Sequence, residues 1–203
     1  MWILIQNQAI GCLDVKTPPP DLAGRLLEVG EQVLRTDPPP RLEDVALLVG
    51  ASRATLYYYF SGRDDLLAFL LTAHVMRGAE AIRGAAEQGG GPEARLRAAV
   101  AAMIGYLGRH PGICAGLLSA LGASGRMEEV LRANDTWIAG PVRELLDEGS
   151  RAGVFTTGEV SDAANAILGA VLLGVLGRSS SAAADDAFCR CLTDQVVRGV
   201  LTS

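Results

Sequence analysis

Residues 42–71, LEDVALLVGASRATLYYYFSGRDDLLAFLL, carry the pattern that decides the fold. Apolar residues recur at helical spacing from Leu42 to Val49, which predicts a short helix. Gly50 follows as the residue suited to a left-handed helix end, and Ser52 is placed to cap the helix that comes next. Two short helices joined by Gly-Ala-Ser predict a helix-turn-helix.

The second of these helices contains three adjacent tyrosines in a chain where aromatic residues make up only 5%. Leu56 and Phe60 lie four residues apart and continue the apolar face, so the tyrosines belong to the exposed side and its edges. Buried phenols need hydrogen-bond partners, and at least two of the three rings should therefore face polar surroundings. A recognition helix presents its first residues to base edges and its flanks to phosphates. The residues expected to contact double-stranded DNA are Ser52, Arg53, Ala54, Thr55, Tyr57, Tyr58 and Tyr59.

The segment after the helix-turn-helix predicts a long helix over about residues 63–88. Ser61 is placed as its N-cap, with Asp64 three residues further on. Arg63 stands in the first turn, where a cation is unfavourable to the helix dipole. Its presence there indicates an outside partner such as a phosphate group, so we add Arg63 to the expected DNA contacts.

The whole chain has 203 residues, of which 49% are hydrophobic, and its mean hydropathy is +0.26. It is long enough to bury a substantial core, and periodicity indicates helix almost throughout. We expect an all-α fold with an N-terminal arm (1–20), a three-helix helix-turn-helix DNA-binding head (21–70) and a helical ligand-binding and dimerisation body (71–203). The arm is either flexible or a short ordered segment packed on a neighbour. Further helices are expected at 21–35, 92–109, 112–122, 127–151, 161–178 and 185–201.

Several kinds of site are not indicated by the sequence. Cys189 and Cys191 would point to roughly opposite helix faces, and His74 and His110 lie far from them, so no zinc site is expected. No catalytic triad or carboxylate pair can be argued from spacing, and the glycines of 87–97 lack the Lys-Ser/Thr of a phosphate loop. No apolar run is long enough to span a bilayer. We therefore expect no enzyme activity, catalytic residue, metal, cofactor or membrane partner, in a protein of the reducing cytoplasm.

The quoted segment resembles the DNA-binding part of the TetR family of bacterial transcriptional regulators. The family pattern is a short helix, Ala-Gly-Val-Ser, a Thr-Leu-Tyr-x-x-Phe core, and a Lys or Arg before a Leu-rich helix. Residues 55–60 match the core and Arg63 matches the basic position, whereas beyond residue 88 the resemblance rests on helical layout. The resemblance implies a homodimer with two N-terminal DNA-binding heads. It also implies an all-α body that binds a small inducer and dimerises through its last two helices.

Two features depart from the family pattern. The family has Thr-Thr or Ser-Thr before the second helix, whereas this chain has Pro40-Arg41, so the cap is lost and Arg41 would contact phosphate by its charge. Residues 21–78 hold six Arg and eight acidic residues, a net charge of −2, although DNA-binding surfaces are usually basic. We expect Arg41, Arg53 and Arg63 on the DNA side and several of the acidic residues to face away from it.

The predicted helix at 161–178 carries a stripe of small residues at alternating spacings of four and three. Small residues let helices approach closely, which suits a four-helix dimer interface formed with the last helix. Ordinary packing within one chain is the alternative. The expected interface residues are Ala163, Ile167, Ala170, Gly174, Gly177, Val196 and Val200.

Apolar residues on the middle helices predict either a plain core or the wall of a small-molecule cavity. His110 precedes Pro111 and is interpreted as a helix-end residue. Polar residues are scarce on these helices, so an effector should be apolar or amphipathic. The expected pocket residues are Met103, Tyr106, Leu107, Leu117, Leu118, Trp137 and Leu168.

Two functions are consistent with these patterns. The first is a ligand-responsive transcriptional regulator, in the first place a repressor, that binds a palindromic operator as a dimer and is released by a small apolar or amphipathic effector. The second is a helical small-molecule-binding or catalytic protein with a degenerate head, which the acidic head and the missing cap favour. The salt dependence of DNA binding separates the two.

Overall fold

The computed structural model of the protein describes residues 16–36, 38, 40–88, 90–120, 126–178 and 185–202. Within these residues every regular element is a helix, and the only β pairing is one isolated bridge between Phe155 and Leu201, which confirms the all-α class. Most of the predicted N-terminal arm, residues 1–15, lies outside the described part. The elements are α2 (Pro20–Arg35), α3 (Leu42–Leu48), α4 (Arg53–Tyr59), α5 (Arg63–Glu87), α6 (Pro92–Arg109), α7 (Pro111–Ala120), α8 (Arg126–Asn134), η1 (Asp135–Ala139), α9 (Gly140–Arg151), α10 (Val160–Leu176) and α11 (Asp186–Arg198).

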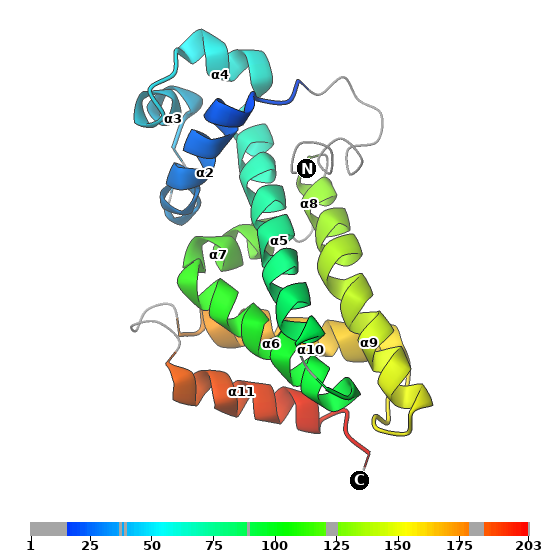
Figure 1. Cartoon of the computed structure of the whole chain (residues 1–203). Coiled ribbons are helices and arrows are strands. Elements are labelled where there is room, and N and C mark those ends of the chain that lie inside the picture. Colours follow the sequence, from blue (N-terminus) through cyan, green and yellow to red (C-terminus); the bar gives the residue numbers. More distant parts are fainter. Residues whose placement is uncertain are drawn as a thin grey trace.

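The helix boundaries follow the expected ranges closely, and α6 agrees with its prediction at both ends. The predicted helix at 127–151 is present as a continuous rod, but its middle part, η1, is π-helical (Figure 1). A π segment accommodates one extra residue within a turn and rotates the side chains on either side of it relative to a regular helix. Nothing in the local sequence pattern predicted this segment.

The helix-turn-helix forms as the sequence predicted. Gly50 has φ of +62°, a left-handed conformation that favours glycine, and it ends α3. The Ser52 Oγ accepts a hydrogen bond from the Thr55 backbone N–H at 3.0 Å and so caps α4. A core of buried apolar residues joins α2, α3, α4 and the first turns of α5, and we call this unit the head (Figure 1).

The starts of α5 and α3 lack the side-chain caps that Ser or Thr would provide. Ser61 does not cap α5, because the N-cap position belongs to Gly62, and the backbone N–H of Ser61 instead donates to Asp65 Oδ2 at 2.9 Å. The start of α3 has no side-chain cap from residue 41, as the sequence predicted. The Asp44 carboxylate instead accepts a hydrogen bond from the Arg41 backbone N–H at 3.2 Å, which satisfies one donor at this end of the helix and places a negative charge at the positive end of the helix dipole.

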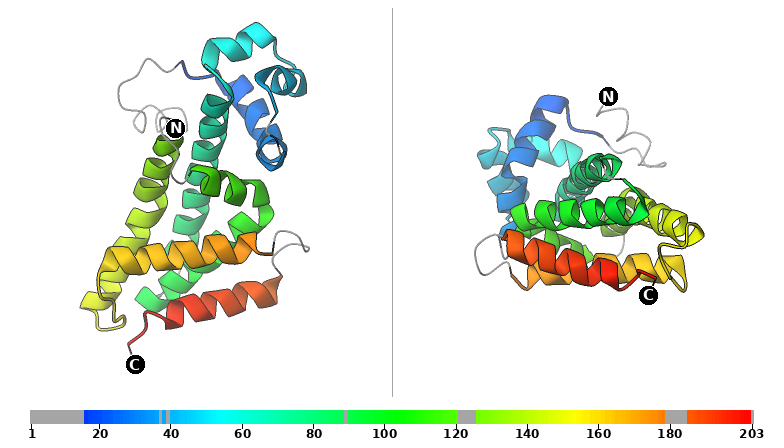
Figure 2. Two further views of the ribbon diagram at one scale, coloured as in Figure 1. Left: turned by 180° about the vertical axis from the view of Figure 1, so that it is seen from behind. Right: turned by 60° about the horizontal axis from the view of Figure 1, so that its bottom comes forward.

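The remaining helices form a second unit, the body, around their own apolar core. Figures 1 and 2 show α5 running from the head along the length of the body, beside α6 and the rod of α8, η1 and α9, with α10 and α11 together at the far end. Arg95 of α6 is paired with Glu148 of α9 at 2.7 Å. Among the described helices, none combines the length and the apolarity that a membrane span requires.

The head and the body also meet where α2 packs against the start of α7. The Glu31 carboxylate of α2 accepts a hydrogen bond from the backbone N–H of Gly112 at 2.7 Å. A Cβ atom at Gly112 would lie 2.8 Å from Arg35 Cγ and 3.1 Å from the Glu31 carbonyl oxygen, so the close approach of these helices depends on glycine. The head is therefore connected to the body by α5 and by this contact.

Candidate DNA interface and effector cavity

The exposed face of α4 carries most of the residues expected to contact DNA. Tyr57 and Tyr58 are 44% and 57% exposed, and Ser52, Arg53 and Ala54 are exposed beside them. Thr55 is half-buried, and its hydroxyl lies 2.7 Å from that of Ser52. Tyr59 is also half-buried, because its ring packs against the core of the head and stacks edge-on against Tyr58. Two of the three phenols thus face outward, as the energetics of burying a phenol requires.

A carboxylate on α3 engages two of these residues. Glu43 is paired with the Arg53 guanidinium at 3.1 Å and accepts a hydrogen bond from the Tyr57 hydroxyl at 3.0 Å. The pKa of Glu43 is held below its usual value, chiefly by a hydrogen bond to its own backbone N–H and then by that from Tyr57. The sequence analysis missed this contact, because ten or more residues separate Glu43 from its partners.

Three further cations belong to the head or precede it in the chain. Arg41 is exposed at the start of α3, and Arg63 is exposed at the start of α5, where it pairs loosely with Asp64 at 3.6 Å. Lys16 precedes α2, and its ammonium group lies 3.8 Å from the centre of the Tyr58 ring, a cation–π contact. The net negative charge of the head is thus accompanied by exposed cations, of which Arg53 belongs to α4 and Lys16 contacts it through Tyr58.

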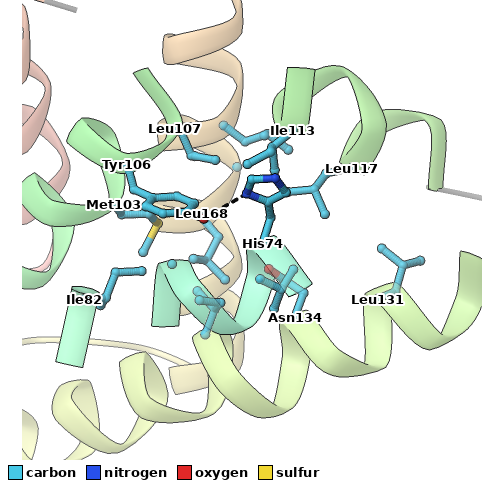
Figure 3. A pocket seen from close by; sticks show the side chains of 15 residues that line it. His74, Ile82, Met103, Tyr106, Leu107, Ile113, Leu117, Leu131, Asn134 and Leu168 are labelled. Carbon is cyan, nitrogen blue, oxygen red and sulfur yellow. Dashed lines mark hydrogen bonds between the residues drawn. The ribbon is translucent and has the colours of Figure 1, made fainter. Parts of the chain in front are cut away.

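A cavity of about 240 Å³ lies in the body. Its described lining is mainly apolar and comes from α5, α6, α7, the α8–η1 rod and α10 (Figure 3). The predicted residues Met103, Tyr106, Leu107, Leu117 and Leu168 line it. Leu118 and Trp137 are not among the lining residues, and Trp137 packs partly buried against the body core.

The cavity has a polar part that the sequence analysis did not recognise. His74 Nδ1 and the Tyr106 hydroxyl oxygen are 3.0 Å apart and share a hydrogen bond, drawn in Figure 3. Gly78 allows this geometry, because the Tyr106 ring lies 3.3 Å from where a Cβ of residue 78 would stand. Asn134, at the junction with η1, supplies the third polar side chain of the lining. His74 lies in a mainly apolar stretch of α5, and this interruption was the one feature of the sequence that could have indicated the polar part of the cavity.

The two ionisable side chains that line the cavity, His74 and Tyr106, are held in their neutral forms. Burial lowers the pKa of His74 to about 4, and it raises the pKa of Tyr106 to about 12. His110 caps the end of α6, as expected of a helix-end residue, and its pKa is also lowered by burial. Its ring lies beside those of His74 and Tyr106, and its Nδ1 atom is 3.9 Å from Glu31 Oε2. This polar group therefore extends from the cavity to the contact between α2 and α7.

The predicted dimer stripe on α10 is divided between the interior and the surface. Ile167 and Val200 are 2% and 8% exposed and belong to the core of their own chain. Ala163 and Val196 pack partly buried against the same core, and a Cβ on Gly174 would lie 2.9 Å from Leu192 of α11. Ala170 and Gly177 are exposed. The close approach at Gly174 is therefore one between α10 and α11 of the same chain.

Other proteins of known structure combine a head and a body of this kind. Residues 89–172 match the family model described as the tetracyclin repressor-like C-terminal domain. The fatty acid degradation regulator FadR from Bacillus halodurans has a similar structure (TM-score 0.75, 18% identity, 90% of this chain and 97% of that chain covered). The ketosteroid transcriptional regulator KstR2 of Mycobacterium tuberculosis is also similar in structure (TM-score 0.69, 17% identity, 93% of this chain and 100% of that chain covered). The same is true of FadR from Bacillus subtilis in complex with stearoyl-CoA (TM-score 0.69, 15% identity, 88% of this chain and 95% of that chain covered). No curated protein sequence matches significantly.

Residues 89–172, which belong to the body, are thus similar to the C-terminal domain of tetracyclin repressor-like proteins. The chain as a whole, with a helix-turn-helix head joined by one long helix to an all-α body, has the fold of these regulators and of a TetR/AcrR-family transcriptional regulator from Thermobifida fusca (TM-score 0.67, 18% identity, 88% of this chain and 98% of that chain covered).

Proposed function

We propose that the protein is a repressor that binds a palindromic DNA operator as a homodimer and is released by a small, mainly apolar effector. The observation that carries this proposal is the course of α5. It begins at Arg63, four residues after α4 ends, and its residues His74, Val75, Gly78 and Ile82 form part of the cavity wall. One rigid element thus connects the DNA-binding face with the cavity.

DNA binding would use the exposed face of α4 in the major groove. The small or short residues at its start, Ser52, Ala54 and Thr55, leave room for base edges, and Tyr57, Tyr58 and Arg53 stand behind them. Arg41, Arg63 and Lys16 would contact phosphates on either side. Tyr59 would support the helix from within the head. The boundary between DNA-binding and ligand-binding parts is proposed at residues 70 and 71, within α5.

Dimerisation would use the outer faces of α10 and α11. Leu173 is 59% exposed, and Ala170 and Gly177 are exposed on the same helix. Two copies of an antiparallel helix pair would bury this surface in a four-helix interface, with two-fold symmetry that matches a palindromic operator. Ile167, Gly174 and Val200 would act indirectly, by fixing α11 against α10.

Release would follow from a change in the tilt of α5. A ligand in the cavity separates α5 from α6, α7 and η1, and the tilt of α5 sets the spacing of the two recognition helices in a dimer. Operator binding requires this spacing to match whole turns of DNA. A preference of about 1.4 kcal/mol for the released form is enough to weaken DNA binding tenfold.

The experiment that tests the proposal is a gel shift with the DNA upstream of the protein's own gene, measured at several salt concentrations. We expect a specific complex whose affinity falls linearly with salt on logarithmic axes, because phosphate contacts release counterions. The alternative function, a small-molecule-binding or catalytic protein with a degenerate head, is favoured by the contact of Glu43 with Arg53 and Tyr57. Absence of a specific complex at low salt would favour that alternative.

A further inference from the structure

We propose that the cavity selects an uncharged molecule of about ten non-hydrogen atoms that carries one carbonyl-type oxygen, and that this oxygen accepts a hydrogen bond from the Tyr106 hydroxyl. The proposal rests on the proposed function only in treating the cavity as the effector site. It deepens that function by naming the size, the charge and the hydrogen-bonding group of the ligand.

The volume of the cavity sets the size of the part of the ligand that it encloses. An apolar protein cavity of about 150 Å³ stays dry and binds benzene, a molecule with six carbon atoms. The cavity here measures about 240 Å³, which at the same density of filling corresponds to about ten non-hydrogen atoms. A molecule as large as the stearoyl-CoA bound by FadR from Bacillus subtilis would extend well beyond this volume. An aromatic ring or a short alkyl chain with one functional group fits it.

The lining determines the charge of the ligand. None of the described lining residues is Asp, Glu, Lys or Arg, so a buried carboxylate, phosphate or ammonium group would find no counter-charge among them. Transfer of an unpaired charge from water to such surroundings is strongly unfavourable. The three polar side chains, His74, Tyr106 and Asn134, are neutral hydrogen-bonding groups near neutral pH. The cavity therefore disfavours ions and retains specificity for a neutral polar group.

The pairing of His74 with Tyr106 determines which hydrogen bond the ligand makes. His74 Nε2 is buried, has no hydrogen-bond partner, and faces Gly30 of α2 at 3.5 Å from an ideal Cβ position. A buried acceptor without a partner is tolerated more readily than a buried N–H without one. The proton of neutral His74 therefore resides on Nδ1, which donates to the Tyr106 oxygen at 3.0 Å.

This tautomer leaves the Tyr106 hydroxyl proton available. A phenol that accepts from His74 Nδ1 still has one O–H group to donate, and the ring stands on the cavity wall in Figure 3. An oxygen without a proton of its own, as in a ketone, ester or lactone, is the matching acceptor. The remainder of the ligand would contact the apolar wall formed by Met103, Leu107 and Leu168.

Three compounds of one shape test the proposal by calorimetric titration of the protein without DNA. Benzylacetone carries a carbonyl group, butylbenzene replaces it with a methylene group, and hydrocinnamate replaces the terminal methyl group of benzylacetone with a charged oxygen. We expect benzylacetone to bind more tightly than butylbenzene by about fivefold to tenfold, the gain from one hydrogen bond. Hydrocinnamate should bind at least about tenfold more weakly than benzylacetone.

The variant Tyr106→Phe should remove the advantage of benzylacetone over butylbenzene, with little change for butylbenzene. Tyr58→Phe is the matched control, since it removes a phenol hydroxyl from the exposed face of α4. Equal binding of benzylacetone and hydrocinnamate, an equal loss for both neutral compounds in Tyr106→Phe, or no binding of any of the three would overturn the proposal. Because DNA is absent, a failed gel shift would overturn the proposed function without affecting this result.

Discussion

At the scale of single residues, Glu43 is unexpected, because it places an acidic side chain beside the face of α4 that is proposed to contact DNA. Its carboxylate engages Arg53 and Tyr57, two of the groups proposed to contact DNA. It also adds a negative charge close to where a phosphate backbone would lie. In the proposed complex, Glu43 would therefore compete with DNA for Arg53 and limit the affinity of the protein for its operator.

The variant Glu43→Gln should bind operator DNA about threefold to tenfold more tightly at low salt, because it removes repulsion from phosphates and releases Arg53. The gain should shrink as salt rises. Glu87→Gln makes the same charge change at the last residue of α5, the end of that helix away from the head, and should have no such effect. Gel shifts at two salt concentrations measure the difference. Weaker binding by Glu43→Gln would instead assign Glu43 the role of positioning Arg53 and Tyr57.

His74 should make the stability of the protein depend on pH. Its pKa is lowered from 6.5 to about 4 in the fold by burial, so between these values the unfolded chain binds a proton that the folded chain does not. The stability from neutral His74 is thus fully present above pH 6.5 and is lost as pH falls towards 4. Acidification from pH 7 to pH 5 should lower the free energy of unfolding by about 2 kcal/mol from this residue.

Urea unfolding at both pH values, compared between the wild type and His74→Phe, isolates this contribution. The variant should be less sensitive to acidification, although it loses the hydrogen bond to Tyr106 at every pH. Glu31, whose pKa is raised by burial, and His110 titrate in both proteins. The same loss of stability on acidification in the two proteins would contradict a neutral, buried His74.

At the scale of elements, the end of α9 depends on a glycine. A Cβ on Gly149 would lie 2.1 Å from Cδ2 and 2.2 Å from Cε2 of Phe155, whose ring is only 4% exposed. Gly149→Ala should therefore displace this ring and lower the free energy of unfolding by about 1–3 kcal/mol. Gly84→Ala, in the interior of α5 with open space around it, should raise it by about 0.5–1 kcal/mol.

Chemical denaturation of both alanine variants gives the comparison, since each adds one methyl group to a helical glycine. If Gly149→Ala were as stable as Gly84→Ala, the packing of Phe155 against α9 would be looser than the structure indicates.

The elements that the sequence predicted are those whose signals are local. Gly50 and Ser52 determine the turn between α3 and α4 within a few residues, and proline and glycine mark the ends of α6. Pairings over long separations were not predictable, such as His74 with Tyr106, because they depend on how helices pack. The same holds for the stripe on α10, where spacing alone cannot tell which small residues face α11 of the same chain and which face solvent.

At the scale of the whole molecule, the proposed dimer places Leu173 at the contact between the two copies. Leu173→Arg should yield monomers by sedimentation velocity, because a buried arginine without a partner opposes association. DNA binding by this variant should also weaken, since the single head of a monomer reads only a half-site. Leu47→Arg is the control, because Leu47 is 81% exposed on α3 of the head. A dimer that persists in Leu173→Arg would locate the interface on another surface.

The position of Lys16 has a practical consequence for handling the protein. The chain has seventeen arginines and this one lysine, and its amino group lies on the Tyr58 ring beside α4. Besides the amino terminus of the chain, reagents that react with amines therefore have a single side chain to modify. Biotinylation or coupling to a sensor chip through lysine would attach the molecule by the side that is proposed to face the operator. Protection of Lys16 from such reagents by an added oligonucleotide would, conversely, give a residue-specific footprint by mass spectrometry.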